Sequence, residues 1–120
     1  MAKILVVEDD AVTRMTLHAV LTRAGHDVVL SPDSSVDLVR HLQEGVDAVV
    51  TDLDMPEIHG YQLISLVRTL SPRPPVIVLS GTGQPQLQMA ADIGAFAALE
   101  KPLDPTTLLE TVDRALVLRP

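Results

Sequence analysis

The feature that most constrains this chain is the regular alternation of two kinds of segment. Short runs rich in β-branched residues alternate with segments in which apolar residues recur at helical spacing. This alternation is typical of a parallel sheet covered by helices on both faces. It predicts an α/β fold of five strand–helix units, with strands at residues 3–7, 27–30, 48–51, 76–79 and 96–99.

The helices are predicted from apolar spacing and from residues that favour helix ends. Leu17, Val20 and Leu21 share one helical face, and Gly25 follows as a C-terminal cap. Asp10 and Asp104 are well placed as N-caps of the first and last helices. The expected helices span residues 11–24, 33–43 and 61–70, a segment that begins at Pro85, and residues 105–118.

Length and charge exclude several classes of protein. The 120 residues fit one domain, residues 1–120, and the absence of cysteine excludes disulfides and thiolate metal sites. Nine basic against 16 acidic residues give a net charge of −7, which opposes binding to nucleic acid or anionic lipid. No run is long enough to span a membrane, and nothing at the N-terminus reads as a signal peptide. We therefore expect a cytoplasmic protein that binds neither nucleic acid nor membrane through this domain.

Chemistry-bearing side chains follow four of the predicted strands. Glu8 and Asp9 follow the first strand, Asp52 the third, Ser80 the fourth and Lys101 the fifth. In doubly wound folds, ligands bind at the carboxyl ends of the strands, where the strand order reverses. These residues are therefore the candidate functional site.

The acidic residues at this edge predict a metal ion. Two carboxylates about 4 Å apart repel by roughly 4 kcal/mol at an effective dielectric near 20, so Glu8, Asp9 and Asp52 need a cation or a shared proton. Hard oxygen ligands on an open rim favour Mg²⁺, with Mn²⁺ as a possible substitute. Asp10 is expected only to cap the following helix.

An aspartate beside Mg²⁺ can attack phosphorus and form an acyl phosphate. The transition state then needs positive charge and a hydroxyl donor near the phosphoryl oxygens. Lys101 and Ser80 would supply them if the strands lie in the order 2-1-3-4-5. The residues thus favour phosphoryl transfer to Asp52.

The motifs together resemble a known family. Residues 4–10 (ILVVEDD), residues 49–56 (VVTDLDMP) leading to Gly60, Ser80-Gly81, Gly94-Ala95 and Lys101-Pro102 resemble the response regulator receiver domain in order and spacing, over the whole chain. The resemblance to these chemotaxis-regulator-like domains implies a flavodoxin-like (βα)5 fold.

The resemblance also implies a role for each matched residue. It makes Asp52 the phosphoacceptor and a metal ligand, Glu8 and Asp9 the acidic pair with Asp9 as the direct ligand, and Asp54 the donor of a backbone carbonyl to Mg²⁺. Ser80 and Lys101 would bind the phosphoryl group. The Lys101–Pro102 bond is usually cis in the family.

The family further implies partners and a way of working. A histidine kinase or histidine phosphotransfer protein would supply the phosphoryl group, and a downstream protein would bind the face formed by the fourth helix, fifth strand and fifth helix. The chain would catalyse only its own phosphorylation and slow dephosphorylation, so it would not be an enzyme that turns over an external substrate. It would be a monomer or a phosphorylation-linked dimer.

One position of the output face departs from the family. Three residues before the lysine, the family typically has an aromatic residue that reports phosphorylation, and this chain has Ala98. Phe96 lies two residues earlier, which moves its side chain along the strand by roughly 6 to 7 Å. The segment between Ser80 and Gly94 is also one residue shorter than usual, which predicts a loop of different shape.

Three other functions compete with this interpretation. A flavin-binding flavodoxin should have a phosphate-cradling loop after its first strand, where this chain has Glu8-Asp9-Asp10. A haloacid-dehalogenase-type phosphatase should have its Asp-x-Asp motif after the first strand of a larger domain. The third alternative is a receiver fold that serves as an interaction module without phosphorylation, which Ala98 favours and the presence of Asp52 and Lys101 opposes.

Overall fold

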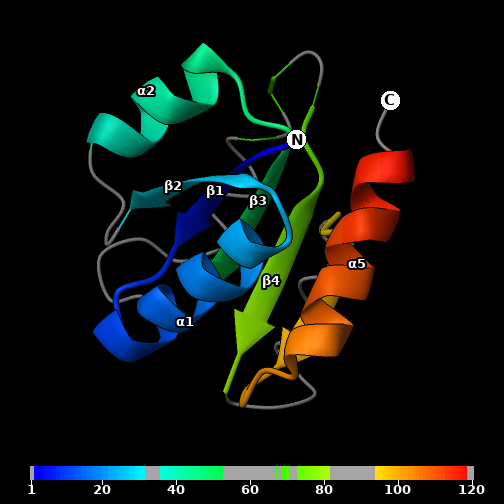
Figure 1. Cartoon of the computed structure of the whole chain (residues 1–120). Helices are drawn as coiled ribbons and strands as arrows, with labels where there is room; N and C mark the ends of the chain where they lie inside the picture. The colour runs from blue at the N-terminus through cyan, green and yellow to red at the C-terminus, as the bar shows by residue number, and fades with distance from the viewer. Residues whose placement is uncertain are drawn as a thin grey trace.

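The computed structural model describes residues 2–31, 36–52, 67, 69–70, 73–81 and 94–118. The described part of the chain begins with three strands separated by two helices, and two further strands and a helix follow (Figure 1). The elements are β1 (Lys3–Val7), α1 (Ala11–Arg23), β2 (Asp27–Ser31), α2 (Val36–Glu44), β3 (Ala48–Asp52), β4 (Val76–Ser80), β5 (Ala97–Glu100) and α5 (Pro105–Leu118).

The strands form one five-stranded parallel sheet in the order β2-β1-β3-β4-β5. This confirms the predicted fold class and strand order. The order reverses between β1 and β3, which lie side by side, so residues that follow these two strands meet at the same edge. This is the edge at which ligands bind in open parallel sheets.

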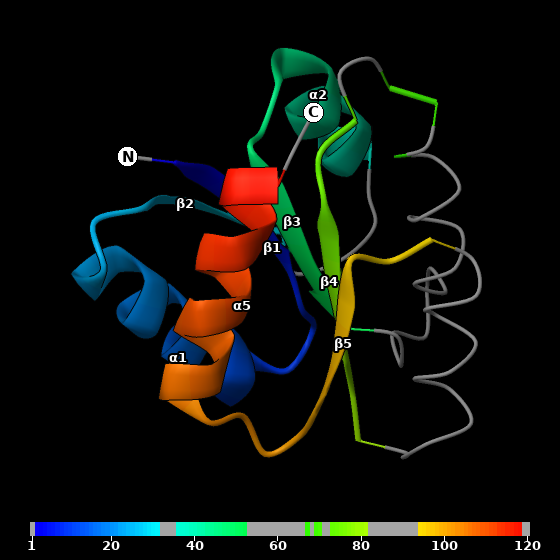
Figure 2. The same ribbon diagram turned by 90° about the vertical axis from the view of Figure 1, so that its right-hand side faces the viewer.

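The sheet is buried on both faces, which explains why its central strands are apolar without alternation. Side chains of β1, β3 and β4 alternate between two core clusters. One cluster contains Leu17 and Leu21 of α1 and Leu108 and Val112 of α5, whereas the other contains Leu42 of α2. Helices α1 and α5 therefore cover one face and α2 the opposite face (Figure 2).

Helix ends follow the predicted capping residues. The Asp10 carboxylate accepts hydrogen bonds from the backbone N–H of Thr13 at 2.9 Å and from its hydroxyl at 2.7 Å. Asp104 caps α5 in the same way through Thr107. At the other end of α1, Gly25 has a φ of +93°, a conformation that glycine adopts without a steric penalty. The three predicted caps are confirmed.

Some predicted boundaries were wrong by one residue. Strand β5 begins at Ala97 rather than at Phe96, because parallel pairing with β4 starts at the pair Ile77 and Ala97. Strands β2, β3 and β4 each extend one residue further and so include Ser31, Asp52 and Ser80. Helix α1 ends at Arg23, with Ala24 as its C-cap.

The second predicted helix ends one residue later than expected, at Glu44. Its first predicted residues, 33–35, lie outside the described residues. So do most of the helix predicted at 61–70, the segment from Pro85, and the loop predicted between Ser80 and Gly94. Among the helices of the described part of the chain, none has the length and apolar character needed to cross a membrane.

Candidate functional site

The register of the sheet brings the predicted site residues to one edge. Val7 pairs with Thr51, so Glu8 and Asp52 follow paired residues of neighbouring strands. Asp52 in turn pairs with Leu79, the residue before Ser80. The backbone N–H of Lys101 donates to the carbonyl of Ser80 at 2.9 Å, which extends the sheet past the end of β5. Parallel pairing thus gathers the ends of β1, β3, β4 and β5.

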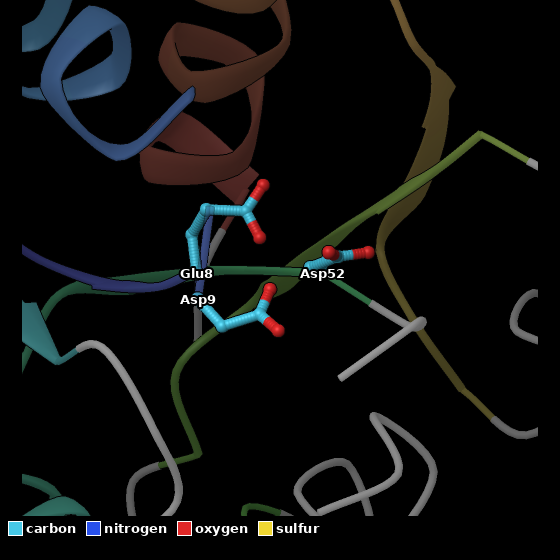
Figure 3. A group of neighbouring side chains, drawn as sticks. All are labelled: Glu8, Asp9 and Asp52. Atoms are coloured by element: carbon cyan, nitrogen blue, oxygen red, sulfur yellow. The ribbon is translucent and has the colours of Figure 1, made fainter. Parts of the chain in front are cut away.

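Three carboxylates meet at this edge. Glu8 and Asp9 extend from the end of β1 towards the side on which Asp52 ends β3 (Figure 3). One carboxylate oxygen from each residue lies within 4.8 Å of the others. Glu8 and Asp52 are buried, with 0% and 3% of their surfaces exposed, whereas Asp9 is exposed. The cluster is thus open to solvent on the side of Asp9.

Lys101 connects the two buried carboxylates. Its Nζ donates to Oε1 of Glu8 at 2.7 Å and to Oδ2 of Asp52 at 3.1 Å. Burial alone would lower the pKa of Lys101, but the ion pairs with Glu8 and then Asp52 outweigh it and raise the pKa above its ordinary value. The lysine is therefore a permanent cation beside Asp52.

Lys101 does not neutralise the cluster completely. Burial and then the neighbouring Asp52 carboxylate raise the pKa of Glu8 to about 7, against the opposing effect of Lys101. The second oxygen of Glu8, Oε2, is buried and makes no hydrogen bond with the described residues. A buried carboxylate oxygen without a partner is costly, so this atom calls for a proton or a cation.

These observations fit a divalent metal ion. The cluster offers three hard oxygen ligands from two adjacent strands, with a solvent-exposed side at which an ion can keep its waters. That donor set suits Mg²⁺ and also Mn²⁺. Asp54, the predicted donor of a backbone carbonyl, lies outside the described residues, as does Gly60.

Ser80 is the last residue of β4, and Pro102 lies two residues after the end of β5. Ser80 is completely buried at the end of β4, next to the strand that ends in Asp52. The Lys101–Pro102 bond is cis, as predicted. The hydroxyl of the buried Thr51 donates to the carbonyl of Asp52 at 3.2 Å.

The sequence analysis missed Arg14. One guanidinium nitrogen of this α1 residue, Nη1, donates to the carbonyl of Glu8 at 3.0 Å and to that of Asp9 at 3.3 Å. The signal was present in the sequence: an arginine in the first turns of the helix that directly follows the acidic residues can reach back to their backbone. No familiar motif marks that pattern.

The two predicted output residues lie at β5 and just before it. Ala98 is half-buried, pairs with Val78, and packs against the core cluster on the α2 face of the sheet. Phe96 precedes the strand and is 36% exposed. An alanine has no side-chain rotamer to change, so the aromatic switch expected of the family has no counterpart at residue 98.

Comparison with known proteins decides the family. A family model described as the response regulator receiver domain matches residues 4–113. The chain belongs to this family. Receiver domains are the phosphorylation-dependent signalling modules of two-component systems; they bind Mg²⁺ at an acidic site and interact with histidine kinases or phosphotransfer proteins.

Individual relatives and structures agree. The receiver domain is 37% identical over 117 residues to the DNA-binding transcriptional regulator NtrC of Rhizobium meliloti, covering 96% of this chain and 24% of the relative. It is 30% identical to the chemotaxis protein CheY of Thermotoga maritima, covering 93% of this chain and 95% of that protein. The crystal structure of a receiver domain protein from Clostridium thermocellum superposes with a TM-score of 0.88 at 29% identity, covering 98% of this chain and 95% of that one.

The relatives differ in length. This receiver domain spans about a quarter of the length of the NtrC and GlrR regulators that it matches, but nearly all of the Thermotoga CheY. The CheY4 structure of Vibrio cholerae, at 30% identity and a TM-score of 0.86, covers 97% of this chain and 99% of that one. The similarity therefore concerns the receiver domain itself.

Proposed function

We propose that this receiver domain is a switch that accepts a phosphoryl group on Asp52 from the phosphohistidine of a kinase or phosphotransfer protein, with Mg²⁺ bound beside it. The observation that carries the proposal is the contact of Lys101 with Asp52 inside a cluster of three carboxylates. A lone buried pair could be structural. This edge of the sheet combines a cation, Lys101, with the buried Asp52 and the exposed Asp9. Such a combination forms a site for a charged reactant.

The proposed reaction is an in-line displacement at phosphorus. A carboxylate oxygen of Asp52 forms a bond to phosphorus, and the bond from phosphorus to the imidazole nitrogen of the donor breaks. The imidazole keeps the electron pair and takes up a proton from solvent. Reset follows when water attacks the acyl phosphate, so that inorganic phosphate leaves and the carboxylate of Asp52 is restored.

The residues around Asp52 have separate tasks in this reaction. Mg²⁺, when bound, would neutralise charge on the phosphoryl oxygens. Glu8 and Asp9 would hold it together with Asp52, and Asp54 would add a backbone carbonyl. Lys101 already donates to Asp52, so we propose that it moves its hydrogen bond from the free carboxylate to a phosphoryl oxygen. Ser80, buried at the end of the next strand, would donate its hydroxyl to another phosphoryl oxygen.

The proposed approach of the donor follows from the surface beside Asp9. Helix α1 begins two residues after Asp9, and Val12 and Met15 on its outer side are 74% and 69% exposed. They are separated by three positions and therefore share one face of the helix. Exposed apolar side chains beside a reactive site suit a protein partner rather than solvent. We propose that the donor rests on this part of α1 while its phosphohistidine reaches Asp52.

Phosphorylation would change the charge at the site. A phosphoryl group adds about −1.5 to −2 charges at neutral pH, and these must be offset by Lys101, Ser80 and the bound cation. We propose that this rearrangement is read by a downstream protein on the face that includes β5 and α5. Because residue 98 is alanine, the signal would depend on the position of Lys101 and its backbone rather than on an aromatic rotamer.

The proposal includes the way in which the domain works. The domain would act only on its own Asp52 and would not turn over an external substrate. It would work in the cytoplasm as a monomer or as a dimer linked to phosphorylation. The competing proposal is an interaction module that is never phosphorylated, and Ala98 is the observation that favours it.

Intact-mass measurement separates these two functions. The native chain is incubated with acetyl phosphate in Mg²⁺ or in a chelator, and in parallel with candidate histidine kinases. The proposal expects a labile mass increase of one phosphoryl group that needs Mg²⁺ and is absent in Asp52→Asn. Asp47→Asn is the matched control, since Asp47 precedes β3 at the opposite end from Asp52 and should leave the adduct unchanged. No adduct from any donor would support the interaction module.

A further inference from the structure

The three consecutive acidic residues after β1 are held in three different ways. Glu8 is paired with Lys101, and Asp10 caps α1 through Thr13. The carboxylate of Asp9 makes no hydrogen bond with any residue that the structure describes. Among the described residues, the backbone that carries it is therefore what sets the direction of its Cα–Cβ bond.

Arg14 contacts that backbone on both sides of Asp9. The carbonyl of Glu8 belongs to the peptide plane before the Asp9 Cα, and the carbonyl of Asp9 belongs to the plane after it. Arg14 Nη1 donates to both, at 3.0 and 3.3 Å. The partial double bond keeps each peptide planar, and because both peptides are trans, each N–H points away from Arg14.

Fixing two successive peptide planes fixes the Cα between them. The φ and ψ angles of Asp9 are the only soft backbone angles between the planes, so the Cα–Cβ bond of Asp9 then has one direction. Arg14 is itself firmly placed, because its backbone N–H donates to the Asp10 carbonyl at 2.9 Å in the first turn of α1. The half-buried guanidinium thus ties the first turn of the helix to the loop that bears Asp9.

We infer that Arg14 is a positioning residue that aims the Asp9 carboxylate at the metal ion through the carbonyls of Glu8 and Asp9. The inference rests on the proposed function, because it assigns a further residue to the same site. Arg14 touches neither the ion nor the phosphoryl group in this role. It acts by reducing the conformations that Asp9 must give up when the ion binds.

Charge alone predicts the opposite effect, which makes the inference testable. Arg14 is a cation close to an acidic metal site, so it repels a divalent cation. If it contributed only its charge, its removal would strengthen Mg²⁺ binding. If it positions Asp9, its removal weakens binding despite the more favourable charge.

The experiment measures the Mg²⁺ dissociation constant by calorimetry or NMR titration, because the chain has no tryptophan to report binding by fluorescence. Mutation of a residue that orients a metal ligand typically lowers the affinity for the metal by about 10- to 100-fold. We expect Arg14→Gln to bind Mg²⁺ about tenfold more weakly than the native chain. Arg23→Gln, at the far end of the same helix, makes the same change in net charge and should bind normally.

A second variant keeps the charge. The ammonium group of lysine lies one bond short of the terminal guanidinium nitrogens of arginine, so Arg14→Lys should also bind Mg²⁺ more weakly than the native chain, though less so than Arg14→Gln. Thermal unfolding in a chelator shows whether each variant folds. If Arg14→Gln does not fold, the Mg²⁺ affinity of Arg14→Lys tests the inference.

Native affinity in the folded variants, or tighter binding by Arg14→Gln, would overturn the inference and leave the proposed function intact. A native chain that binds no Mg²⁺ would refute the proposed function itself.

Discussion

The Nζ of Lys101 lies between Glu8 and Asp52, 2.7 Å from a carboxylate oxygen of the first and 3.1 Å from one of the second. This single ammonium group neutralises part of the charge that β1 and β3 bring together. It occupies the side of the cluster towards β5, whereas Asp9 lies on the exposed side. Lys101 and a metal ion can therefore contact the same two carboxylates from different sides.

Replacing Lys101 should slow phosphorylation more than it affects the fold. Loss of a preorganised donor to a developing charge typically lowers a rate by about 10² to 10³. We expect Lys101→Met to accept a phosphoryl group from acetyl phosphate about 100-fold more slowly, measured by intact mass over time. Lys3→Met is the matched control, because Lys3 begins β1 at the opposite end of the sheet. Equal rates for the two variants would refute the role of Lys101.

The same variant should change how Glu8 titrates. Lys101 lowers the pKa of Glu8 against the larger effects of burial and of Asp52. Without the ammonium group, the pKa should rise above about 7. Carbon-detected NMR of the Glu8 carboxyl group in metal-free protein measures this directly, and a fall in the pKa would contradict the assigned contact.

Mg²⁺ affinity should depend on pH near neutrality. The ion binds the ionised carboxylate, whereas metal-free Glu8 holds its proton below a pKa of about 7. The ion must therefore displace a proton at pH 6 but hardly any at pH 8, so its apparent affinity should fall by roughly tenfold per pH unit below 7. Calorimetry in buffers of different ionisation enthalpy counts the protons released. Glu8→Gln should lose this pH dependence, and a pH-independent native affinity would contradict the prediction.

Asp10 should contribute to the stability of the fold and not to the binding of Mg²⁺. Its hydrogen bonds with Thr13 lower the pKa of its carboxyl group below the ordinary value of 3.8. Because the pKa is lower in the folded chain, the ionised carboxylate stabilises the fold at pH values above the ordinary pKa. This contribution is lost as the pH falls through the pKa of the folded chain. We expect Asp10→Ala to unfold at a lower temperature than the native chain at pH 7, with the difference shrinking in acid.

The metal site provides the contrast for that variant. Asp10→Ala should bind Mg²⁺ normally, because the Asp10 carboxylate is committed to the helix end, whereas Asp9→Asn should bind it poorly. Equal losses of Mg²⁺ affinity in the two variants would show that Asp10 is a ligand and would contradict the division of tasks among the three acids.

The outer face of α1 should affect transfer from a protein but not from a small molecule. Val12→Gln and Met15→Gln alter side chains that are 74% and 69% exposed, so the free energy of unfolding should change little. Transfer from a phosphorylated partner should slow, while the rate with acetyl phosphate should stay constant. Val117→Gln, equally exposed at the far end of α5, is the control. A slower reaction with acetyl phosphate would instead indicate a disturbed site.

Much of the fold could be predicted because the composition of its central strands is compatible with only one position in a sheet. The runs at residues 3–7, 48–51 and 76–79 are apolar without alternation, which requires burial on both faces and hence a central parallel strand. The caps at Asp10 and Asp104 could be predicted because capping depends on a few adjacent residues. The start of β5 was harder to predict, because its alanines have little preference for a strand.

The sequence predicted which residues gather at this edge of the sheet, but not the contacts that they make there. Strand order alone gathers Glu8, Asp52 and Lys101 at one edge. Which carboxylate Lys101 meets, and whether Glu8 is buried, depends on side-chain packing that no spacing encodes. Arg14 was missed for a related reason, since its partners are backbone carbonyls, which are the same for every amino acid.

The most direct test of the central claim is to locate the phosphoryl group on the chain. An acyl phosphate is reduced by borohydride to an alcohol, which converts a phosphorylated aspartate into homoserine and leaves a free aspartate unchanged. After incubation with acetyl phosphate and Mg²⁺, followed by borohydride and peptide mass spectrometry, we expect homoserine at residue 52 and at no other aspartate. Homoserine at another position, or none after exposure to every phosphodonor, would contradict the account.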